Sequence, residues 1–238
     1  MEDDALFRAH LANMRSLDRA FAVAARECRA AIARGDQRVV DALTNTCGLL
    51  LGARLENRLY RLLYEPNGFN EQQRMRVLAG GSLDQAWLRI VDEAFAARRG
   101  LRPSQVPRQL GFTDAARRRI LRDMIEHQLA PLITLRNILA HGQWSRALSL
   151  DKKEISSQRT RQLRVNRLWH LQIKANLVDH LVRLLHDLVV TKDAFERDFD
   201  RHWKDLESAR RRLELDGYRR WEATLSEKYA RRPKRDLA

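Results

Sequence analysis

The sequence predicts an all-α protein, a bundle of five to seven helices, and two observations favour this fold class. Apolar residues recur every three or four positions along most of the chain, which is the spacing of one face of a helix. The 238 residues include only five prolines and ten glycines, too few for the many turns of a β-sandwich. Apolar residues make up 44% of the chain and charged residues 32%, so the chain can bury a core without metals or disulfides.

Two long helices are predicted at the N-terminus. Apolar residues follow the helical spacing through 4–33, and the pattern resumes through 37–64. Gly35 separates the two helices because glycine readily ends a helix, and Asp36 is a suitable N-cap for the second. The Pro-Asn-Gly sequence at 66–68 then ends the second helix with residues that favour turns.

The middle of the chain alternates between loops and helices. Residues 65–81 show no regular apolar spacing, which indicates an irregular connection. Ser82 and Gln85 form a capping-box pattern at the start of a helix over 82–99. Residues 100–112 contain two prolines and two glycines, so we expect a loop there.

A further helix, capped by Thr113, is rich in arginine and leucine and carries an apolar run that ends at Gly142. Pro131 lies within this run and cannot donate a helical hydrogen bond, so we expect a kink or a break near Ala130. Residues 143–158 lose the helical spacing and are expected to form a loop, with at most a short extended piece.

The C-terminal third predicts helices over about 161–190 and 192–229. Residues 192–235 carry 14 basic and 10 acidic side chains, and their apolar residues are too sparse for a wide core-facing surface. This pattern is typical of a long charged helix that packs narrowly or mediates assembly. The chain therefore divides into an N-terminal helix (1–35), a helical domain (36–190) and a charged C-terminal helix and tail (191–238).

The net charge of +14 indicates a polyanionic partner. Arginine supplies 38 of the 45 basic residues, and no lysine occurs before residue 152. A GC-rich coding bias explains most of the preference for arginine over lysine, but it does not explain the excess of positive charge. RNA, DNA and anionic membrane surfaces all attract such a chain, and arginine binds phosphate through two parallel hydrogen bonds.

The cysteines and the N-terminal residues indicate a cytoplasmic protein. Cys28 and Cys47 lie in apolar helical surroundings and match neither a zinc motif nor a disulfide framework, so we interpret them as buried thiols. The first ten residues are acidic and lack the apolar run of a signal peptide. No segment approaches the roughly 18 apolar residues of a membrane span.

The sequence TLRNILAHGQW at 134–144 places polar residues at the end of an apolar helix. Asn137 and His141 are four residues apart and share one helix face, and the long side chain of Arg136 can reach toward the same face. Gly142 suits the position just after the helix end, which places His141 at the C-terminus of the helix dipole.

These three residue types are sufficient for metal-independent RNA cleavage. Attack by the 2′-OH of the RNA requires a group that moves protons near neutral pH, and histidine is the side chain that does so. Arginine stabilises the charge on the phosphorane, and asparagine can orient the histidine or the phosphate. A single copy of the motif offers only one proton carrier, so the reaction favours a homodimer that brings two copies together.

The run from Arg136 to His141 resembles the R-x(4–6)-H signature of HEPN domains, and the resemblance extends over roughly 36–190. HEPN domains are all-α and usually dimeric, and many are metal-independent endoribonucleases that act as toxins of toxin–antitoxin systems or in anti-phage defence. The resemblance implies that His141 is the catalytic histidine, Arg136 the phosphate-stabilising arginine and Asn137 a supporting polar residue. It also implies a composite site across the dimer, an antitoxin or defence partner, and no cofactor or metal. One subgroup carries a modified tyrosine two residues after the histidine, where this chain has Gln143.

Two alternatives remain open. A non-catalytic HEPN-like helical module that binds nucleic acid or a protein partner shares the basic charge but requires neither Arg136 nor His141. In that case Arg136 pairs with a nearby acid and His141 caps the helix. A DNA-binding regulator is a third interpretation, although the sequence shows no helix-turn-helix with a recognition helix.

A basic segment that follows the motif is the predicted RNA-binding surface, for tRNA or mRNA. Residues 151–174 have a net charge of +5, and Trp144 and Trp169 lie nearby. Arginine and lysine hold phosphates while aromatic rings stack on unpaired bases. The alternative is an ordinary solvated helix face. The predicted RNA contacts are Lys152, Lys153, Arg159, Arg161, Arg164 and Arg167.

The remaining histidines do not predict a metal site. His170, His180 and His186 are ten and six residues apart on one expected helix, and none of these spacings is the i, i+4 pair that binds a metal from a single helix. His127 is expected to be a partly exposed helix residue.

Overall fold

The computed structural model describes residues 2–215 and 217–231, and the all-α prediction is confirmed over this part of the chain. The predicted tail at 232–238 lies outside the described residues. The α-helices are α1 (Glu2–Arg34), α2 (Gln37–Leu63), α3 (Glu71–Leu78), α4 (Leu83–Arg99), α5 (Val106–Gln109), α6 (Phe112–Met124), α7 (Ala130–Ala140), α8 (Ser157–Val165), α9 (Leu168–Val189), α10 (Lys192–Glu214) and α11 (Tyr218–Ala230). A 3₁₀ turn at Pro103–Gln105 precedes α5, and a π-helical turn at Ile125–Leu129 joins α6 to α7.

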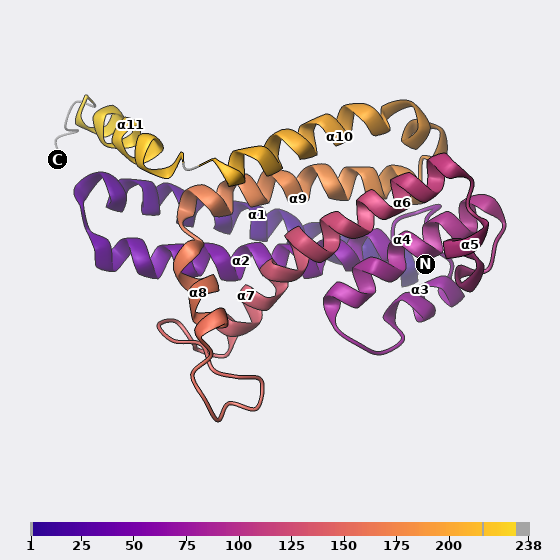
Figure 1. Ribbon diagram of the computed structural model, residues 1–238, viewed down its shortest axis with the longest axis horizontal. Helices are drawn as coiled ribbons and strands as arrows, with labels where there is room; N and C mark the ends of the chain where they lie inside the picture. Colours follow the sequence, from indigo (N-terminus) through magenta and orange to yellow (C-terminus); the bar gives the residue numbers. More distant parts are fainter. Residues whose placement is uncertain (1, 216, 232–238) are drawn as a thin grey trace.

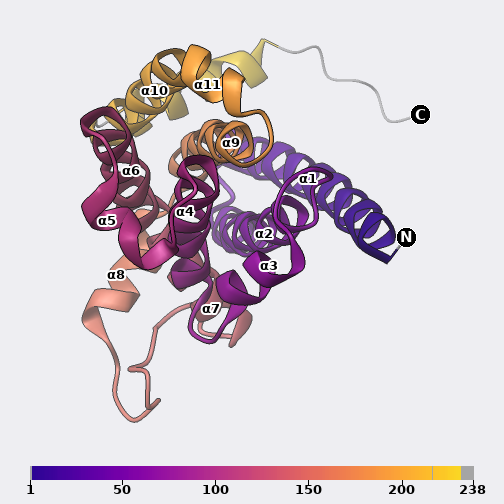
Figure 2. The same ribbon diagram turned by 90° about the vertical axis from the view of Figure 1, so that its right-hand side faces the viewer.

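The long helices α1, α2 and α9 lie side by side along the long axis of the molecule (Figure 1). Helix α10 folds back along the outer side of α9, and α11 packs on α1 near the turn between α1 and α2 (Figures 1 and 2). The α6–α7 run crosses the bundle diagonally, so that α6 contacts α4 while α7 lies against α2. One continuous cluster of buried apolar side chains, from Phe21 to Leu225, joins these helices and draws on each of the three predicted segments.

Local capping residues explain where the first two helices meet. Gly35 adopts a left-handed conformation, with φ of +71°, and ends α1 as expected. The Asp36 carboxylate accepts a hydrogen bond from the Val39 amide at 3.2 Å, which confirms it as the N-cap of α2.

Pro131 changes the helix register as expected. It cannot donate a backbone hydrogen bond, and the preceding residues form a π-helical turn in which the Ala130 amide donates to the Ile125 carbonyl. Helix α7 therefore begins anew at Ala130, with the proline in its first turn, where the missing N–H costs least.

The number of helices exceeds the predicted five to seven, because short helices lie in segments that were expected to be irregular. Helix α3 lies within 65–81, where Asn70 and Gln73 form a capping box. The 3₁₀ turn and α5 lie within 100–112, and α8 begins at Ser157, before the predicted start near 161.

Two further expectations are corrected. Ser82 precedes α4, but its side chain makes no capping hydrogen bond, so the predicted capping box with Gln85 is wrong. The single charged helix expected over 192–229 is two helices, because α10 ends at Glu214 and α11 begins at Tyr218. Among the described residues, no helix combines the length and apolar character needed to cross a membrane.

Candidate active site at the end of α7

Glycines on α2 allow α7 to approach closely. Gly52 faces Arg136, and a Cβ atom added at Gly52 would lie 2.1 Å from the Arg136 Cβ. Gly48, one turn earlier, faces Leu135 and Leu139, with a virtual Cβ 3.2 and 3.1 Å from their side chains. The pair of glycines, four residues apart on one face of α2, therefore fixes how closely the backbone of Arg136 approaches α2.

Arg136 is held by two neighbours. Its Nη2 lies 2.6 Å from Glu56 Oε2 on α2, and its Nη1 donates to Asn137 Oδ1 at 3.0 Å. The Arg136 and Glu56 side chains are 33% and 39% exposed, so the pair lies at the surface. A guanidinium has five N–H donors, and these contacts use two of them, so donors remain for a phosphate.

His141 is the C-cap of α7. Gly142 follows with φ of +73°, its amide donates to the Leu139 carbonyl at 3.0 Å, and the Gln143 amide donates to the Ile138 carbonyl at 3.2 Å. This is the Schellman arrangement, and it confirms the expected place of Gly142 just after the helix end. The His141 side chain is exposed, and it makes no hydrogen bond or ion pair with any residue that the structure describes.

The structure joins two of the three motif side chains directly. Arg136 and Asn137 are hydrogen-bonded, whereas the His141 side chain contacts neither of them through a hydrogen bond among the described residues. His141 is tied to the pair through its backbone, because its amide donates to the Asn137 carbonyl at 3.2 Å. A single chain therefore presents a hydrogen-bonded arginine–asparagine pair and, at the same helix end, an imidazole open to solvent.

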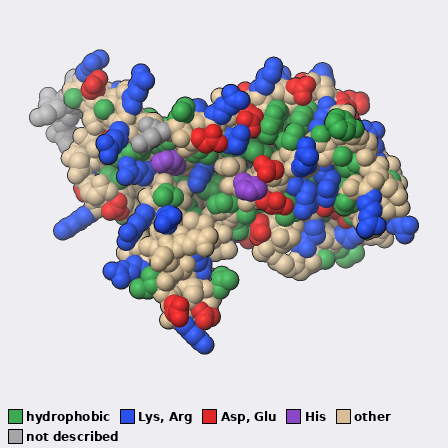
Figure 3. Space-filling model, viewed as in Figure 1, with side chains coloured by type: hydrophobic (Ala, Val, Ile, Leu, Met, Phe, Trp, Pro, Cys, Tyr) green, Lys and Arg blue, Asp and Glu red, His purple; other side chains and the backbone are tan. Residues whose placement is uncertain are grey.

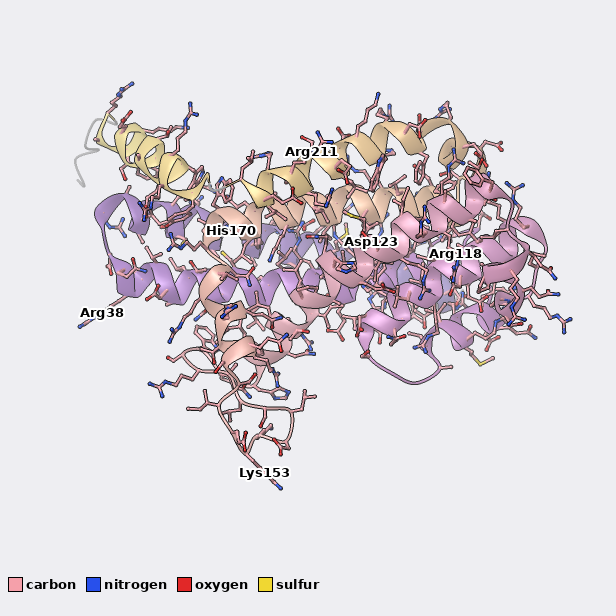
Figure 4. All side chains as sticks on the ribbon, viewed as in Figure 1. Arg38, Arg118, Asp123, Lys153, His170 and Arg211 are labelled. Carbon is pink, nitrogen blue, oxygen red and sulfur yellow. The ribbon has the colours of Figure 1, made fainter. Side chains whose placement is uncertain are left out.

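A hairpin-like loop follows the motif. Leu148 and Ile155 form an isolated antiparallel bridge, and the Ser149 amide donates to the Glu154 carbonyl at 2.8 Å. The Asp151 carboxylate accepts hydrogen bonds from the Ser149 hydroxyl and the Lys153 amide, and these bonds hold the turn together. They also lower the pKa of Asp151. This pairing is the short extended piece expected within 143–158, and Lys153 lies at the tip of the loop that extends away from the helices (Figure 4).

The predicted RNA-binding residues fall into two groups. Lys152, Lys153, Arg161 and Arg164 are exposed, and their side chains make no ion pair or hydrogen bond within the described chain. Arg159 instead donates to the Leu148 carbonyl at 2.8 Å and ties α8 to the hairpin. Figure 3 shows basic side chains at the tip and along the flank of this projecting lobe, with acidic side chains beside the tip, and both kinds are spread over much of the main body.

Arg167 stacks on an aromatic ring of α11. Its Cζ lies 4.3 Å from the centroid of the Tyr218 ring, a cation–π contact, and the Tyr218 hydroxyl donates to Glu222 at 2.9 Å. Burial and this hydrogen bond raise the pKa of Tyr218 to about 12, so the phenol stays neutral. Arg167 therefore anchors α11 and is only partly available for RNA.

A cleft beside the motif combines arginines with aromatic rings. It has a volume of about 780 Å³ and lies between the start of α2, the residues after α7, the α8–α9 junction and α11. Trp144, Arg164, Arg167 and Tyr218 line it, and the Trp144 indole is fixed by donating to the Leu139 carbonyl at 2.9 Å. Trp144 is three residues from His141 in the chain, but Arg136, Asn137 and His141 do not line the cleft.

Sequence reasoning missed Glu56, Gly48 and Gly52. Glu56 lies on a leucine-rich helix with no local sign that it pairs with Arg136, which is 80 residues away in the chain. The spacing of the two glycines, four residues apart within one helix, was the available signal for a close helix contact.

Comparisons with models of protein families, with curated proteins and with solved structures find no match for this chain.

Proposed function

We propose that the chain is a metal-independent endoribonuclease of the HEPN type, acting as a homodimer in the cytoplasm within a bacterial toxin–antitoxin or anti-phage defence system. The observation that carries the proposal is the exposed His141, whose side chain bonds to no described residue, on the same helix end as the hydrogen-bonded Arg136–Asn137 pair. The resemblance of this run to the R-x(4–6)-H signature supplies the family and its setting.

The reaction follows from the chemistry of these groups. A neutral imidazole removes the proton from the RNA 2′-OH, whose oxygen attacks the adjacent phosphorus. The bond from phosphorus to the 5′-oxygen breaks, and a protonated imidazole donates a proton to that leaving oxygen. The products are a 2′,3′-cyclic phosphate and a 5′-hydroxyl end. In a dimer the two His141 side chains are the base and the acid, and Arg136 stabilises the phosphorane charge.

The surroundings of the motif favour RNA as the substrate class. The exposed basic residues Lys152, Lys153, Arg161 and Arg164 can neutralise phosphates, and the exposed Trp144 ring in the cleft can stack an unpaired base. The net charge of +14 also favours an acidic protein partner such as an antitoxin.

A second candidate, a non-catalytic module that binds nucleic acid or protein, has its own supporting observation. Glu56 already neutralises Arg136, and no described side chain orients the His141 ring. Catalytic histidines are usually oriented by a second group, so a binding role accounts for this arrangement within one protomer.

Cleavage in EDTA separates the two candidates. The purified protein is incubated with tRNA and mRNA beside His141→Ala, with His127→Ala as the matched control because His127 is an exposed helix histidine that contacts Asp123, one turn earlier. We expect the parent and His127→Ala to cut RNA and leave cyclic phosphate ends, and His141→Ala to be inactive. Equal cleavage by His141→Ala, or RNA binding without cleavage by a folded parent dimer, contradicts the ribonuclease proposal and favours the binding module.

A further inference from the structure

Three potential metal ligands meet where α10 packs along α9. His180 lies on α9, and His202 and Asp205 lie three residues apart on α10, which places the last two on one helix face. Each of the three offers a nitrogen or oxygen atom, and these atoms lie within 4.8 Å of one another. The turn at 190–191 reverses the chain, so residues about equally far before and after it come together.

Each imidazole has a buried Nδ1 atom that makes no hydrogen bond with any described residue. His202 is only 9% exposed, and its Nδ1 has no hydrogen-bond partner among the described residues. The Nδ1 of His180 is likewise buried and unpartnered, at 3.8 Å from Asp205 Oδ2. A buried polar atom without a partner destabilises the folded state, so two such nitrogens beside one carboxylate favour a bound cation at this place.

A second carboxylate supports His202 from the other side. Asp187 Oδ2 lies 3.7 Å from His202 Nε2, and Asp187 Oδ1 accepts a hydrogen bond from the Thr191 hydroxyl at 2.9 Å. In protein metal sites the histidine nitrogen that does not bind the metal commonly faces a carboxylate, which fixes the ring and its tautomer. Asp187 is placed for this role, which leaves the Nδ1 of His202 for a metal.

We propose that His180, His202 and Asp205 bind one divalent transition-metal ion of the Zn²⁺ class, which fastens α10 to α9. Two imidazoles and one carboxylate suit Zn²⁺ and its first-row neighbours, whereas Mg²⁺ and Ca²⁺ prefer oxygen ligands throughout. Metal bonds of about 2.1 Å place tetrahedral ligands about 3.4 Å apart, so small side-chain rotations close the site. Asp205 is exposed, so water can supply the fourth ligand.

This site is separate from the α7 motif and is independent of the proposed ribonuclease function. None of its ligands belongs to α7 or the basic segment, so the metal acts on the packing of α10 and takes no part in cleavage. The two proposals can therefore be tested separately. Absence of RNA cleavage would contradict the ribonuclease proposal alone, and absence of Zn²⁺ binding would contradict the metal proposal alone.

The test is metal binding by the full, untagged chain after its metal has been stripped with EDTA and the chelator removed. Equilibrium dialysis against Zn²⁺ with elemental analysis is expected to give one ion per chain. Thermal unfolding is expected at a temperature roughly 5 °C higher with saturating Zn²⁺, because the ion binds only the folded state. Excess Mg²⁺ is expected to give neither effect.

Substitutions at the proposed ligands test which residues bind the metal. We expect Asp205→Asn to weaken Zn²⁺ binding at least tenfold and His180→Gln to abolish the stoichiometric site, while both keep the helical content of the parent. His127→Gln is the matched control and is expected to bind as the parent does. Asp205 is exposed, so Asp205→Asn is expected to fold and can be tested even if a substitution at buried His202 prevents folding. Less than half an ion per chain, or equal Zn²⁺ affinity in Asp205→Asn, His180→Gln and His127→Gln, overturns the proposal.

Discussion

Glu56 on α2 and Arg136 on α7 form an ion pair one helical turn from the contact of Gly52 with Arg136, with Arg136 Nη2 2.6 Å from Glu56 Oε2. The carboxylate holds the guanidinium in a fixed orientation beside Asn137, and it also offsets the positive charge that a phosphate would bind. The two effects can be separated, because glutamine keeps an accepting oxygen at position 56 and removes the charge.

Glu56 is therefore expected to act as a positioning residue for Arg136. We expect Glu56→Ala to lower RNA cleavage at least tenfold, because Arg136 loses the group that orients it. Glu56→Gln is expected to retain cleavage within about threefold and to bind RNA slightly more tightly, since one negative charge is removed. The measurement is kcat and KM for a short RNA. Equal losses in both variants would show that charge, and not orientation, is what Glu56 supplies.

Gly52 is expected to tolerate no larger residue. A Cβ there lies 2.1 Å from the Arg136 Cβ, so Gly52→Ala must push α7 away from α2. We expect a loss of roughly 1–3 kcal/mol in the free energy of unfolding, despite the better helix propensity of alanine, measured by urea denaturation. Gly111→Ala is the control, because nothing lies within 4 Å of its virtual Cβ and its φ is −60°. A Gly52→Ala protein as stable as Gly111→Ala would contradict the close packing of α2 and α7.

The sequence predicted the fold class because helical spacing is a local property of each segment. The ends of α1 and α7 were also predictable, since Gly35 and Gly142 act within one turn of their own helices. Short helices such as α3 and α8 were not predicted, because eight or nine residues contain too few apolar positions to show the helical spacing.

The place of the α7 motif was predictable, but its neighbours were not. Arg136 and His141 lie on one helix end, as their spacing indicates, whereas Glu56 reaches Arg136 only through the packing of α2 on α7. The cluster of His180 with His202 was missed for the same reason, because its members lie on two helices and only the tertiary fold brings them together.

The exposed basic residues after the motif are expected to carry the salt dependence of RNA binding. Replacing Lys152, Lys153, Arg161 and Arg164 together by alanine should make the slope of log K against log salt less steep by about 2–3, since each phosphate contact on a single strand contributes about 0.7. The control replaces four exposed arginines elsewhere, which removes the same charge: Arg15, Arg38, Arg108 and Arg119. Equal slopes for the two variants would mean that RNA responds only to net charge.

Lys174 is expected to make stability depend on pH in the alkaline range. Burial lowers its pKa to about 8, and its Nζ donates to Asn166 Oδ1 at 2.5 Å. Below pH 8 the amine is charged in both states and the folded state bears the full cost of burying it. Between pH 8 and the unfolded pKa of about 10.4 the folded state binds fewer protons, so stability rises with pH.

Lys174→Met removes the buried amine whose loss of a proton makes stability depend on pH. We expect the variant to be more stable than the parent by on the order of 2 kcal/mol at pH 7, with the difference shrinking as the pH rises to 10. Urea unfolding at pH 7, 8, 9 and 10 measures it, and Lys152→Met, at an exposed position, serves as the control. A difference between Lys174→Met and the parent that stays constant over this range would contradict a lowered pKa.

The proposed composite site predicts that an inactive chain also inactivates the active chain with which it pairs. If one His141 is the base and the other the acid, a dimer of one parent chain and one His141→Ala chain lacks one of the two proton carriers. When the two proteins are mixed in equal amounts and allowed to exchange subunits, random pairing leaves about a quarter of the dimers with two histidines, so activity per parent chain falls to roughly half. The measurement uses saturating RNA, so that the inactive chains do not act by sequestering substrate, and His127→Ala replaces His141→Ala in the control mixture. Activity that is proportional to the parent chain alone would mean that each protomer cleaves RNA by itself, and a second proton carrier would then have to be sought within the same chain.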